Sequence, residues 1–439
     1  MDEKYLTNLE LSNNCKSKFV KIQTFEELKN IKSKKNFISQ GAGLSYSDAS
    51  FGNNILTVNF QKFNNTLHFD EANRTIEVES GCTLKQIFEK FANRNLYLTV
   101  QPGWPDLCIG SLIACNAHGK NTYKYGNFKN IVISIKLYHP EYGIVNCSRS
   151  ENHEIFDLTV GGMGLTGFII SAVLKLEPLG GNICSKEILK INSFEEIDQV
   201  FQNEKDNYDT MMSWANLSNP KKFKALIILT KTHFKKNYKI KIPKYNKIDL
   251  RYSKTRFNFF YKNINIFLNS LFYNQQLILR KKEIDIFPEL FPFYNKPFYF
   301  DMYGKKGFLS FQLIIPRDNF LLFIIEFKKL MVKYDVSIVL TLLKLFKGQK
   351  NFLNFSMDGI SIYCDLPNTP KNNIFINVLN EICHNYGCVN NIFRNHLLTK
   401  KNVINQFGKE YYDFKDKLNN FDKKRLFNSA LSIRLGLDK

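Results

Sequence analysis

The sequence predicts an α+β protein with more than one domain, on three observations. Its 439 residues exceed the size of one average domain, so two or three domains are expected. Its hydrophobic content of 44% is sufficient for packed cores. Over the first 182 residues, short runs typical of strands alternate with helical periodicity, which favours mixed secondary structure. We therefore expect a folded, globular α+β chain.

Four short β runs lie near the start of the chain. They are NFISQ (36–40), NILTVNF (54–60), TLHFD (66–70) and TIEVE (75–79). Their alternation and β-branched content are typical of strands. The residues ANR (72–74) separate the last two runs and predict a hairpin turn between them.

The segment TLKQIFEKFANRN (83–95) predicts the first clear helix. Thr83 and Gln86 have the spacing of a capping box, in which each side chain bonds a backbone amide of the first turn. The apolar residues recur at helical spacing and predict one buried face: Leu84, Ile87, Phe88 and Phe91.

The second region is richer in aromatic residues. FLSFQLIIP (308–316) and ISIYCDLP (360–367) predict strands, and DNFLLFIIEFKKLMVKY (318–334) predicts a helix between them. The C-terminal segment returns to helical spacing, and we expect it to pack back on the first domain. The expected domains are residues 1–182, 183–391 and 392–439.

The charge balance admits several partners. Lys and Arg outnumber Asp and Glu by 61 to 40, a formal net charge of +21. This excess would suit nucleic acid, an anionic membrane surface or a phosphorylated substrate, and it does not choose among them. No aromatic-and-basic RNA-binding motif is present, so we do not expect a nucleic-acid partner.

Nine cysteines are scattered without a C-x-x-C pair, so neither a zinc site nor a disulfide framework is indicated, and we expect no metal. The amino-terminal residues lack a secretory signal pattern. No run reaches the roughly 18 apolar residues that a membrane span needs. We expect a cytoplasmic protein that is either soluble or peripheral at the inner face of the membrane.

Three glycine-rich elements fall in the first domain. In the first, Gly41 and Gly43 follow a strand, where backbone amides without a nearby Cβ can form an anion-binding nest. It is not the dinucleotide fingerprint, because Tyr46 replaces the third glycine, and an ordinary turn is the alternative. The other two elements span residues 101–121 and 160–178. Together they predict the walls of a groove for an extended phosphorylated cofactor.

The order of four motifs then resembles a known family. GAGLSYSDA (41–49), IEVESGCTL (76–84), QPGWPDLCIGSLIACNAHGKN (101–121) and VGGMGLTGFI (160–169) are similar to the PCMH-type FAD-binding domain of the vanillyl-alcohol-oxidase family. Within it the chain resembles the decaprenylphosphoryl-β-D-ribose 2'-oxidase-like FAD-linked oxidases. The resemblance implies a two-subdomain FAD-binding domain followed by an antiparallel-sheet substrate domain.

The resemblance also implies which residues bind FAD. The loop Gly41, Ala42, Gly43, Leu44, Ser45 and Tyr46 would hold the pyrophosphate, joined by Pro102, Gly103 and Gly110. Along the isoalloxazine would lie Ala114, Cys115, His118, Gly119 and Asn121, with Gly164 and Ile169 near the adenosine half. Many relatives attach flavin to a histidine at the position of Leu44, so the leucine implies noncovalent FAD.

Three residues carry expectations about catalysis, each with a plainer alternative. His118 would help take the proton of the substrate hydroxyl, or would only anchor its loop. Lys400, matched to the family's lysine, would stabilise reduced flavin as a fixed cation, or would form an exposed basic pair with Lys401. Lys120 would contact a phosphate or a substrate oxygen, or would be a surface lysine.

Further residues match the family's substrate pocket: Trp214, Gln312, Lys344, Phe346 and Tyr363. Lys344 would pair with a substrate phosphate. Core packing is the alternative for Trp214 and Phe346. Tyr363 stands where the family has a cysteine, and Cys364 is shifted by one residue, to the opposite face of a strand. The pocket is therefore altered.

Residues 253–282 mix aromatic and aliphatic side chains with basic ones, among them Arg256, Lys262, Arg280, Lys281 and Lys282. This composition is suited to a membrane interface with anionic headgroups, and burial of an amphipathic helix is the alternative.

The sequence thus predicts an FAD-dependent oxidoreductase. The resemblance implies oxidation of a secondary hydroxyl of a sugar, above all the ribose 2'-hydroxyl of a polyprenyl-phosphate-linked pentose in cell envelope biosynthesis. This oxidation would be the first half of an epimerisation, and the keto sugar would then pass to an NAD(P)H-dependent short-chain reductase. The alternatives are a soluble sugar, alditol or aldonolactone oxidase that uses O2, and a basic polyanion- or membrane-binding protein without catalysis.

Overall fold

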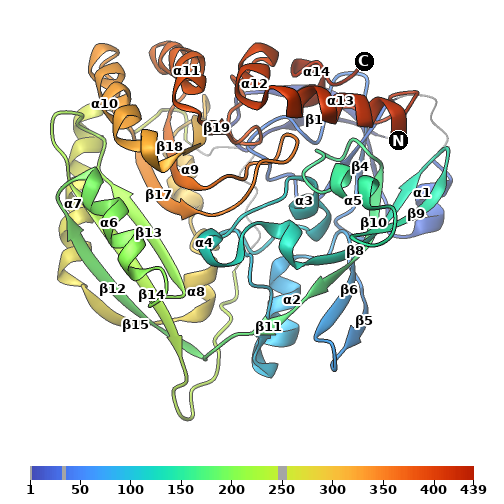
Figure 1. Ribbon diagram of the computed structural model, residues 1–439, viewed down its shortest axis with the longest axis horizontal. Helices are drawn as coiled ribbons and strands as arrows, with labels where there is room; N and C mark the ends of the chain where they lie inside the picture. The colour runs from blue at the N-terminus through green and yellow to red at the C-terminus, as the bar shows by residue number, and fades with distance from the viewer. Residues whose placement is uncertain (1, 32–35, 246–254) are drawn as a thin grey trace.

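The protein has an α+β fold, as the sequence predicts (Figure 1). The structure is a computed structural model and describes residues 2–31, 36–245 and 255–439. Within these ranges the strands form a four-stranded, a five-stranded, a two-stranded and an eight-stranded sheet. Residues 253 and 254 of the predicted membrane segment lie outside the described ranges.

The four-stranded sheet lies at the start of the chain. Its strands, in spatial order, are β1 (Asp2–Thr7), β2 (Asn14–Lys21), β4 (Leu56–Asn59) and β3 (Phe37–Gln40). β1 and β2 are antiparallel, whereas β4 runs parallel to both β2 and β3. The short helix α1 (Phe25–Lys29) follows β2, and Thr24 caps its N-terminus. The first glycine-rich loop leaves the end of β3.

The five-stranded sheet is antiparallel throughout. Its strands, in spatial order, are β5 (Thr66–Asp70), β6 (Thr75–Glu79), β10 (Phe168–Lys175), β8 (Val132–His139) and β9 (Gly143–Ser148). β5 and β6 form the predicted hairpin, with Arg74 at positive φ in the turn. β7 (Leu96–Tyr97) pairs with β11 (Glu177–Pro178) as a separate ribbon.

The helices of this half are short. They are α2 (Leu84–Phe91), η1 (Ala92–Arg94), α3 (Ile109–Ala114), α4 (Thr122–Tyr125), η2 (Phe128–Ile131) and α5 (His153–Thr159). The Thr83–Gln86 capping box is present, and all four predicted apolar residues of α2 are buried. The predicted helix and its face are therefore confirmed.

The eight-stranded sheet occupies residues 183–390 and is antiparallel at every pairing. Its spatial order is β15 (Lys281–Asp285), β12 (Ile183–Ile191), β14 (Ala225–His233), β13 (Thr210–Ala215), β17 (Leu340–Phe346), β18 (Gly359–Pro367), β16 (Phe308–Ile315) and β19 (Val389–Asn390). The predicted strands at 308–316 and 360–367 are β16 and β18.

The two faces of this sheet have different environments. One face packs into the largest apolar core with α6 (Phe194–Glu204), α10 (Arg317–Lys333), α11 (Pro370–Ile382) and η3 (Cys383–Tyr386). The other face carries a row of directly paired residues: Leu226, Trp214, Leu342, Tyr363 and Gln312. Residues directly opposite each other on neighbouring strands share a face, so this row crosses the sheet on the side away from that core.

Three more helices lie between β14 and β16 along the chain. They are α7 (Lys262–Ile278), α8 (Ile286–Leu290) and α9 (Pro297–Asp301). α7 packs against Leu226 and Trp214, and thus covers the second face of the sheet. α8 instead packs with the first half of the chain, because Phe287 and Phe291 belong to the core that contains α2.

The C-terminal segment contains α12 (Lys400–Phe407), α13 (Lys409–Phe421) and α14 (Ala430–Arg434). After α13 the backbone runs beside β3: Phe37 N donates to Leu426 O, and Asn428 N donates to Phe37 O. Ala430 N donates to Phe51 O in the same region. Figure 1 shows α10 to α13 along the top of the view. These bonds tie the end of the chain to its first sheet.

Among residues 2–31, 36–245 and 255–439, no helix combines the length and apolar character that crossing a membrane requires. The same residues contain no group of three or more His, Cys, Asp or Glu side chains arranged to hold a metal ion.

Phe88 joins the two halves of the molecule and gives a test of the fold. Its ring is buried and lies 5.7 Å from that of Phe287 and 5.9 Å from that of Phe291. We expect Phe88→Ala to lower the free energy of unfolding by about 3–5 kcal/mol, since the cavity left between α2 and α8 cannot fully collapse. Urea denaturation followed by circular dichroism would measure it.

The matched control is Lys90→Ala, on the exposed side of the same helix, which should change that free energy by no more than about 0.5 kcal/mol. Equal effects of the two substitutions would contradict the packing of α8 on α2.

Candidate functional site

A large cavity lies where the first glycine-rich loop, α3 and the segment after β19 meet. Its empty volume is about 1330 Å³, including space open to solvent. Many of the residues predicted to bind FAD line it: Gly41, Ala42, Gly43, Leu44, Ser45, Tyr46, Pro102, Gly110, Ala114, Cys115, His118 and Ile169. Segments far apart in the sequence therefore meet at one site.

Glycines allow the backbone to pass close to the cavity walls. A Cβ on Gly41 would lie 2.5 Å from Ser111 Oγ and 2.9 Å from Cys108 Cβ. A Cβ on Gly110 would lie 2.8 Å from Ser80 Cβ. A Cβ at either position would be too close to its neighbours, so glycine lets the loop approach α3 at Gly41 and lets α3 approach Ser80 at Gly110. Gly43 has φ +70°, a conformation that L residues rarely adopt.

Polar atoms in the cavity wall indicate a bound ligand. Ser80 Oγ and Trp104 Nε1 are buried and have no hydrogen-bond partner among the described residues. Buried polar groups are normally paired, because an unpaired one costs about 1–3 kcal/mol. Glycine loops free of side chains and spare donors along a long cavity fit an extended phosphorylated group such as FAD.

His118 lies at this cavity within a hydrogen-bond network. Its Nε2 is 3.1 Å from Gln312 Oε1, which also accepts a bond of 3.0 Å from Asn391 Nδ2. Gln312 Nε2 donates to Ser361 Oγ at 3.1 Å. His118 Nδ1 also lies 3.3 Å from Gly119 O, so both ring nitrogens face an acceptor, and a neutral imidazole donates to one of the two. Gln312 is buried, so the β16 strand fixes the imidazole.

Burial, assisted by the charges of Lys344 and Arg394, lowers the pKa of His118 to about 3. The imidazole is therefore neutral at physiological pH. Its ring also packs against Phe346 and Phe355, with centroid distances of 5.0 and 5.6 Å. A neutral, low-pKa imidazole is a weak base, and this geometry favours orientation of a ligand over storage of a proton.

Arg394 is the cation that lines the cavity, and the sequence analysis missed it. Its guanidinium lies over the ring of Tyr46, 4.0 Å from the centroid, and 4.9 Å from the centroid of Tyr363. Cation–π contacts hold a guanidinium flat against a ring while its edge keeps N–H donors. Because the guanidinium stays protonated, the cavity wall carries a permanent positive charge.

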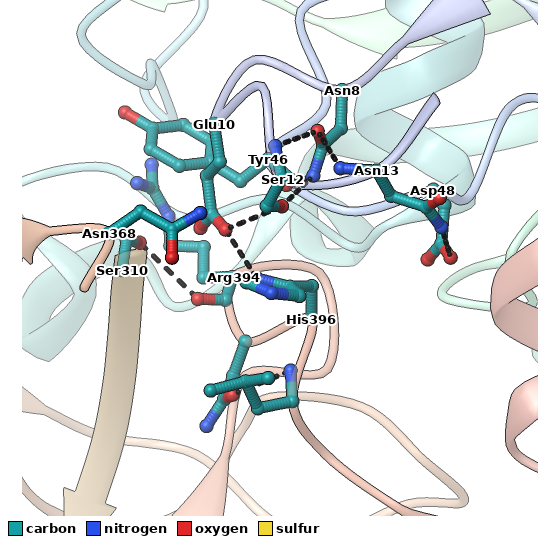
Figure 2. Close-up of polar contacts among 12 residues, drawn as sticks. Asn8, Glu10, Ser12, Asn13, Tyr46, Asp48, Ser310, Asn368, Arg394 and His396 are labelled. Carbon is teal, nitrogen blue, oxygen red and sulfur yellow. Dashed lines mark hydrogen bonds and ion pairs between the residues drawn. The ribbon is translucent and has the colours of Figure 1, made fainter. Parts of the chain in front are cut away.

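The backbone of Arg394 is fixed on both sides (Figure 2). Ser310 Oγ donates to Arg394 O at 3.2 Å, and His396 Nδ1 lies 2.7 Å from Glu10 Oε2 in the loop between β1 and β2. Arg434 donates to His396 O and also pairs with Asp48 at 2.7 Å. The segment that carries Arg394 is thus held by the eight-stranded sheet and by the first half of the chain.

Lys344 lies behind the cavity, on β17. Its Nζ donates to Gly119 O at 3.4 Å. Burial, with the positive charges of Arg394 and Lys120, lowers the pKa of Lys344 to about 7. Two cations and a neutral histidine therefore share a small, largely desolvated region, which favours binding of an anion.

Tyr363 and Asp365 lie behind Arg394 on β18. Burial raises the pKa of Asp365 to about 7, against hydrogen bonds donated by the hydroxyls of Tyr363 and Tyr299. Tyr363 is on the face of the sheet that carries Gln312, as the strand pattern predicts. Cys364 packs on the opposite face, in the core with α10 and α11.

Lys400 lies outside this arrangement. It is the first residue of α12, its side chain is exposed, and it is not among the residues that line the cavity. The role expected for Lys400 therefore finds no support in the geometry. The cation that does line the cavity, Arg394, lies six residues earlier within NNIFRNHLL, where a single basic residue carries no local signal in the sequence.

Lys120 also differs from its expected role. Its Nζ pairs with Glu289 Oε1 of α8 at 2.7 Å and donates to Glu289 O. Thr210 Oγ1 donates to the same carboxylate at 3.3 Å. Lys120 thus has an internal partner that joins the first half of the chain to α8, and it is not in contact with the cavity.

The other predicted site residues have packing roles in the structure. Gly103 packs against Phe293, Gly119 against the backbone of Gln101, and Gly164 against Ser39. Asn121 Nδ2 donates to Thr99 O. Phe346 is buried against His118, and Trp214 is buried under α7, away from the cavity. For Trp214 the core-packing alternative describes what the structure shows.

Comparisons with known proteins support the assignment of this cavity to FAD. Residues 26–148 match a sequence family described as an FAD binding domain. Over 359 residues the chain is 24% identical to decaprenylphosphoryl-β-D-ribose oxidase of Mycolicibacterium smegmatis, covering 75% of this chain and 74% of that protein.

Two D-lactate dehydrogenases match a shorter part. The mitochondrial cytochrome-linked enzyme 1 of Saccharomyces cerevisiae is 29% identical over 27% of this chain and 21% of its own length. That of Archaeoglobus fulgidus is 30% identical over 26% of each. The FAD binding domain, the relatives and the glycine-lined cavity lead to one conclusion: the chain is an FAD-dependent oxidoreductase, with FAD as its cofactor.

Proposed function

We propose that this enzyme oxidises a secondary hydroxyl of a sugar carried on a polyprenyl phosphate, most simply the 2'-hydroxyl of a pentose. The observation that carries the proposal is the pair of cations, Arg394 and Lys344, beside the neutral His118. An uncharged sugar alone would not need two buried positive charges. The similarity to a decaprenylphosphoryl-β-D-ribose oxidase over 75% of the chain supports the same substrate class.

The roles of the residues follow from their charge and burial. Bound FAD supplies a two-electron acceptor. Arg394 offers a fixed positive charge where negative charge develops, and a desolvated site strengthens that interaction. Lys344 pairs with the substrate phosphate. His118, fixed by Gln312, orients the sugar hydroxyl through its imidazole.

The product of this reaction is a keto sugar, and its chemistry defines the next step. Reduction of that ketone from the opposite face would complete an epimerisation, so an NAD(P)H-dependent short-chain reductase is the partner in this proposal. The reaction would serve cell envelope biosynthesis, with the enzyme at the inner face of the membrane. A sugar or aldonolactone oxidase that uses O2 is the rival.

The first test is the visible spectrum of the purified protein. We expect flavin absorbance that passes into the supernatant on acid precipitation, because Leu44 lines the cavity where covalent relatives have histidine. The holoenzyme is then mixed, without oxygen, with prenyl-phosphoryl pentoses, free pentoses, aldonolactones and D-lactate. Bleaching by the prenyl-phosphoryl pentoses is the expected result.

Bleaching only by a free sugar, an aldonolactone or D-lactate would reject the lipid-linked substrate while leaving the flavoenzyme intact. Flavin retained in the acid precipitate would contradict noncovalent binding.

Arg394 and Lys400 give a second test, because the two cations differ in position. We expect Arg394→Ala to retain FAD and to lower turnover by about 10²–10³-fold, the usual cost of removing one charge-stabilising donor. Arg394→Lys should recover part of the loss, since it restores the charge without the planar fork. Lys400→Ala is the control and should have nearly unchanged turnover. Stopped-flow flavin reduction compares all three variants. A large loss in Lys400→Ala together with little loss in Arg394→Ala would disprove the assignment.

Lys344 predicts a pH dependence with a definite sign. A lysine is charged below its pKa, so with a pKa of about 7 its positive charge falls from about 0.9 at pH 6 to about 0.1 at pH 8. A phosphodiester keeps its charge over this range. We expect kcat/KM for a prenyl-phosphoryl pentose to fall about tenfold from pH 6 to pH 8, and Lys344→Met to have a low, flat profile.

The free pentose serves as the control substrate, because it has no phosphate for Lys344 to bind. If kcat/KM rose with pH instead, Lys344 would act as a base rather than as a phosphate-binding cation.

A further inference from the structure

Helix α7 is oriented opposite to an ordinary surface helix. Its buried residues are Asn265, Asn269 and Tyr273, of which two are amides. The opposite side exposes large apolar side chains: Ile264, Phe267, Leu271 and Ile278. Phe267 is 64% exposed and Ile278 is 83% exposed. A surface helix normally buries its apolar face, so this arrangement requires an explanation.

The buried amides fix the orientation of α7. Asn265 Nδ2 donates to Ser337 Oγ at 2.8 Å and to Ile338 O at 2.9 Å. Asn269 Nδ2 donates to Val339 O at 3.2 Å. A rotation of α7 that buried its apolar side would leave these backbone acceptors unpaired, at a cost of about 1–3 kcal/mol each. The exposed apolar face is therefore a consequence of the fold.

The apolar face continues beyond the helix on both sides. Before α7, Phe257, Phe259 and Tyr261 are exposed, and after it Leu279 is exposed. The spacing of Ile264, Phe267, Leu271 and Ile278 places their side chains along one side of the helix. We call these exposed residues of the helix and of the segments on either side of it the α7 face.

Basic residues flank both ends of the α7 face. Arg256 and Lys262 precede or begin the helix, and Arg280, Lys281 and Lys282 follow it, all with exposed side chains. Of these, Lys262 pairs with Asp335 and Lys281 pairs with Glu187 at the surface. The helix itself contains no Asp or Glu. An apolar face between two basic ends matches the apolar interior and anionic headgroups of a lipid surface.

The α7 face lies near the functional site. α7 covers the same face of the eight-stranded sheet that carries Gln312 and Tyr363. Four strand spacings separate Leu226, under α7, from Gln312, or roughly 19 Å. Phe260, just before α7, packs in one apolar cluster with Tyr46 and Trp104, which line the cavity. Figure 1 shows α7 at the left edge of the molecule, where it can contact another surface.

We propose that the α7 face docks on an anionic lipid bilayer and lies in its interface without crossing it. A second copy of this chain is a less favourable occupant, because two molecules of net charge +21 would bring their flanking basic residues together. In an anionic bilayer, the exposed apolar side chains can enter the interface while the basic residues at both ends contact the headgroups. Docking in this way would hold the nearby cavity close to the membrane.

Vesicle sedimentation of the FAD-loaded enzyme tests the proposal without any sugar substrate, so its outcome is independent of the proposed function. The vesicles are phosphatidylcholine alone or with about one third phosphatidylglycerol. We expect the enzyme to sediment with the anionic vesicles. The triple variant Phe267→Gln, Leu271→Gln and Ile278→Gln should bind them about tenfold or more weakly, since it removes the side chains that would enter the interface.

The matched control changes a second exposed apolar set, on α10: Leu322→Gln, Ile325→Gln and Val332→Gln. α10 lies on the opposite face of the sheet, so this control should bind vesicles as the native enzyme does. A third variant, Arg280→Gln, Lys281→Gln and Lys282→Gln, should reduce the preference for anionic over neutral vesicles. Flavin content and circular dichroism confirm that each variant is folded.

Three results would overturn the proposal. The first is native enzyme that stays in the supernatant with anionic vesicles. The second is equal loss of binding in the α7 and α10 variants. The third is a dimer in analytical ultracentrifugation that the α7 variant converts to a monomer while vesicle binding is unchanged, which would assign the α7 face to a second copy of the chain.

Discussion

The buried amide of Gln312 is the junction on which the functional site depends. Through its side chain it joins His118 of the first half of the chain, Ser361 of the neighbouring strand and Asn391 of the C-terminal segment. Each bond also satisfies a group that burial would otherwise leave unpaired, so the three parts of the chain cannot separate without cost. The cavity exists because these parts are held together. The imidazole of His118, the cations Arg394 and Lys344 and the glycine-rich loops are therefore fixed relative to one another.

The two cations near the cavity, Arg394 and Lys344, lie in different environments. Arg394 is stabilised as a cation by the faces of Tyr46 and Tyr363, whereas Lys344 is buried beside it and its pKa falls to about 7. The same positive charges and the same burial keep His118 neutral. A region of this kind binds anions and stabilises developing negative charge, because few waters are present to screen it. It also leaves the histidine to orient ligands, since protonating it would add a third positive charge.

The eight-stranded sheet serves two purposes through its two faces. One face packs with α6, α10 and α11 and supplies most of the apolar core of this half of the molecule. The other carries Gln312, Tyr363 and Lys344 toward the cavity and accepts α7 at its far end. The asparagines of α7 donate to the backbone carbonyls of Ile338 and Val339, just before β17. The apolar side of α7 is left exposed as a result.

Local patterns in the sequence were sufficient for the parts of the fold that local physics decides. The capping box at Thr83, the buried face of α2, the β5–β6 hairpin and the strands β16 and β18 could all be predicted, because short-range periodicity and turn chemistry specify them. The glycine loops indicated the cavity, since only a close backbone approach explains so many glycines. Tertiary structure alone decided which charges meet there. Lys400 is separated from the cavity and Arg394 lines it, Lys120 pairs with Glu289, and α7 turns its asparagines inward. The distance between two charges, and the side of a helix that a sheet accepts, depend on residues more than a hundred positions away.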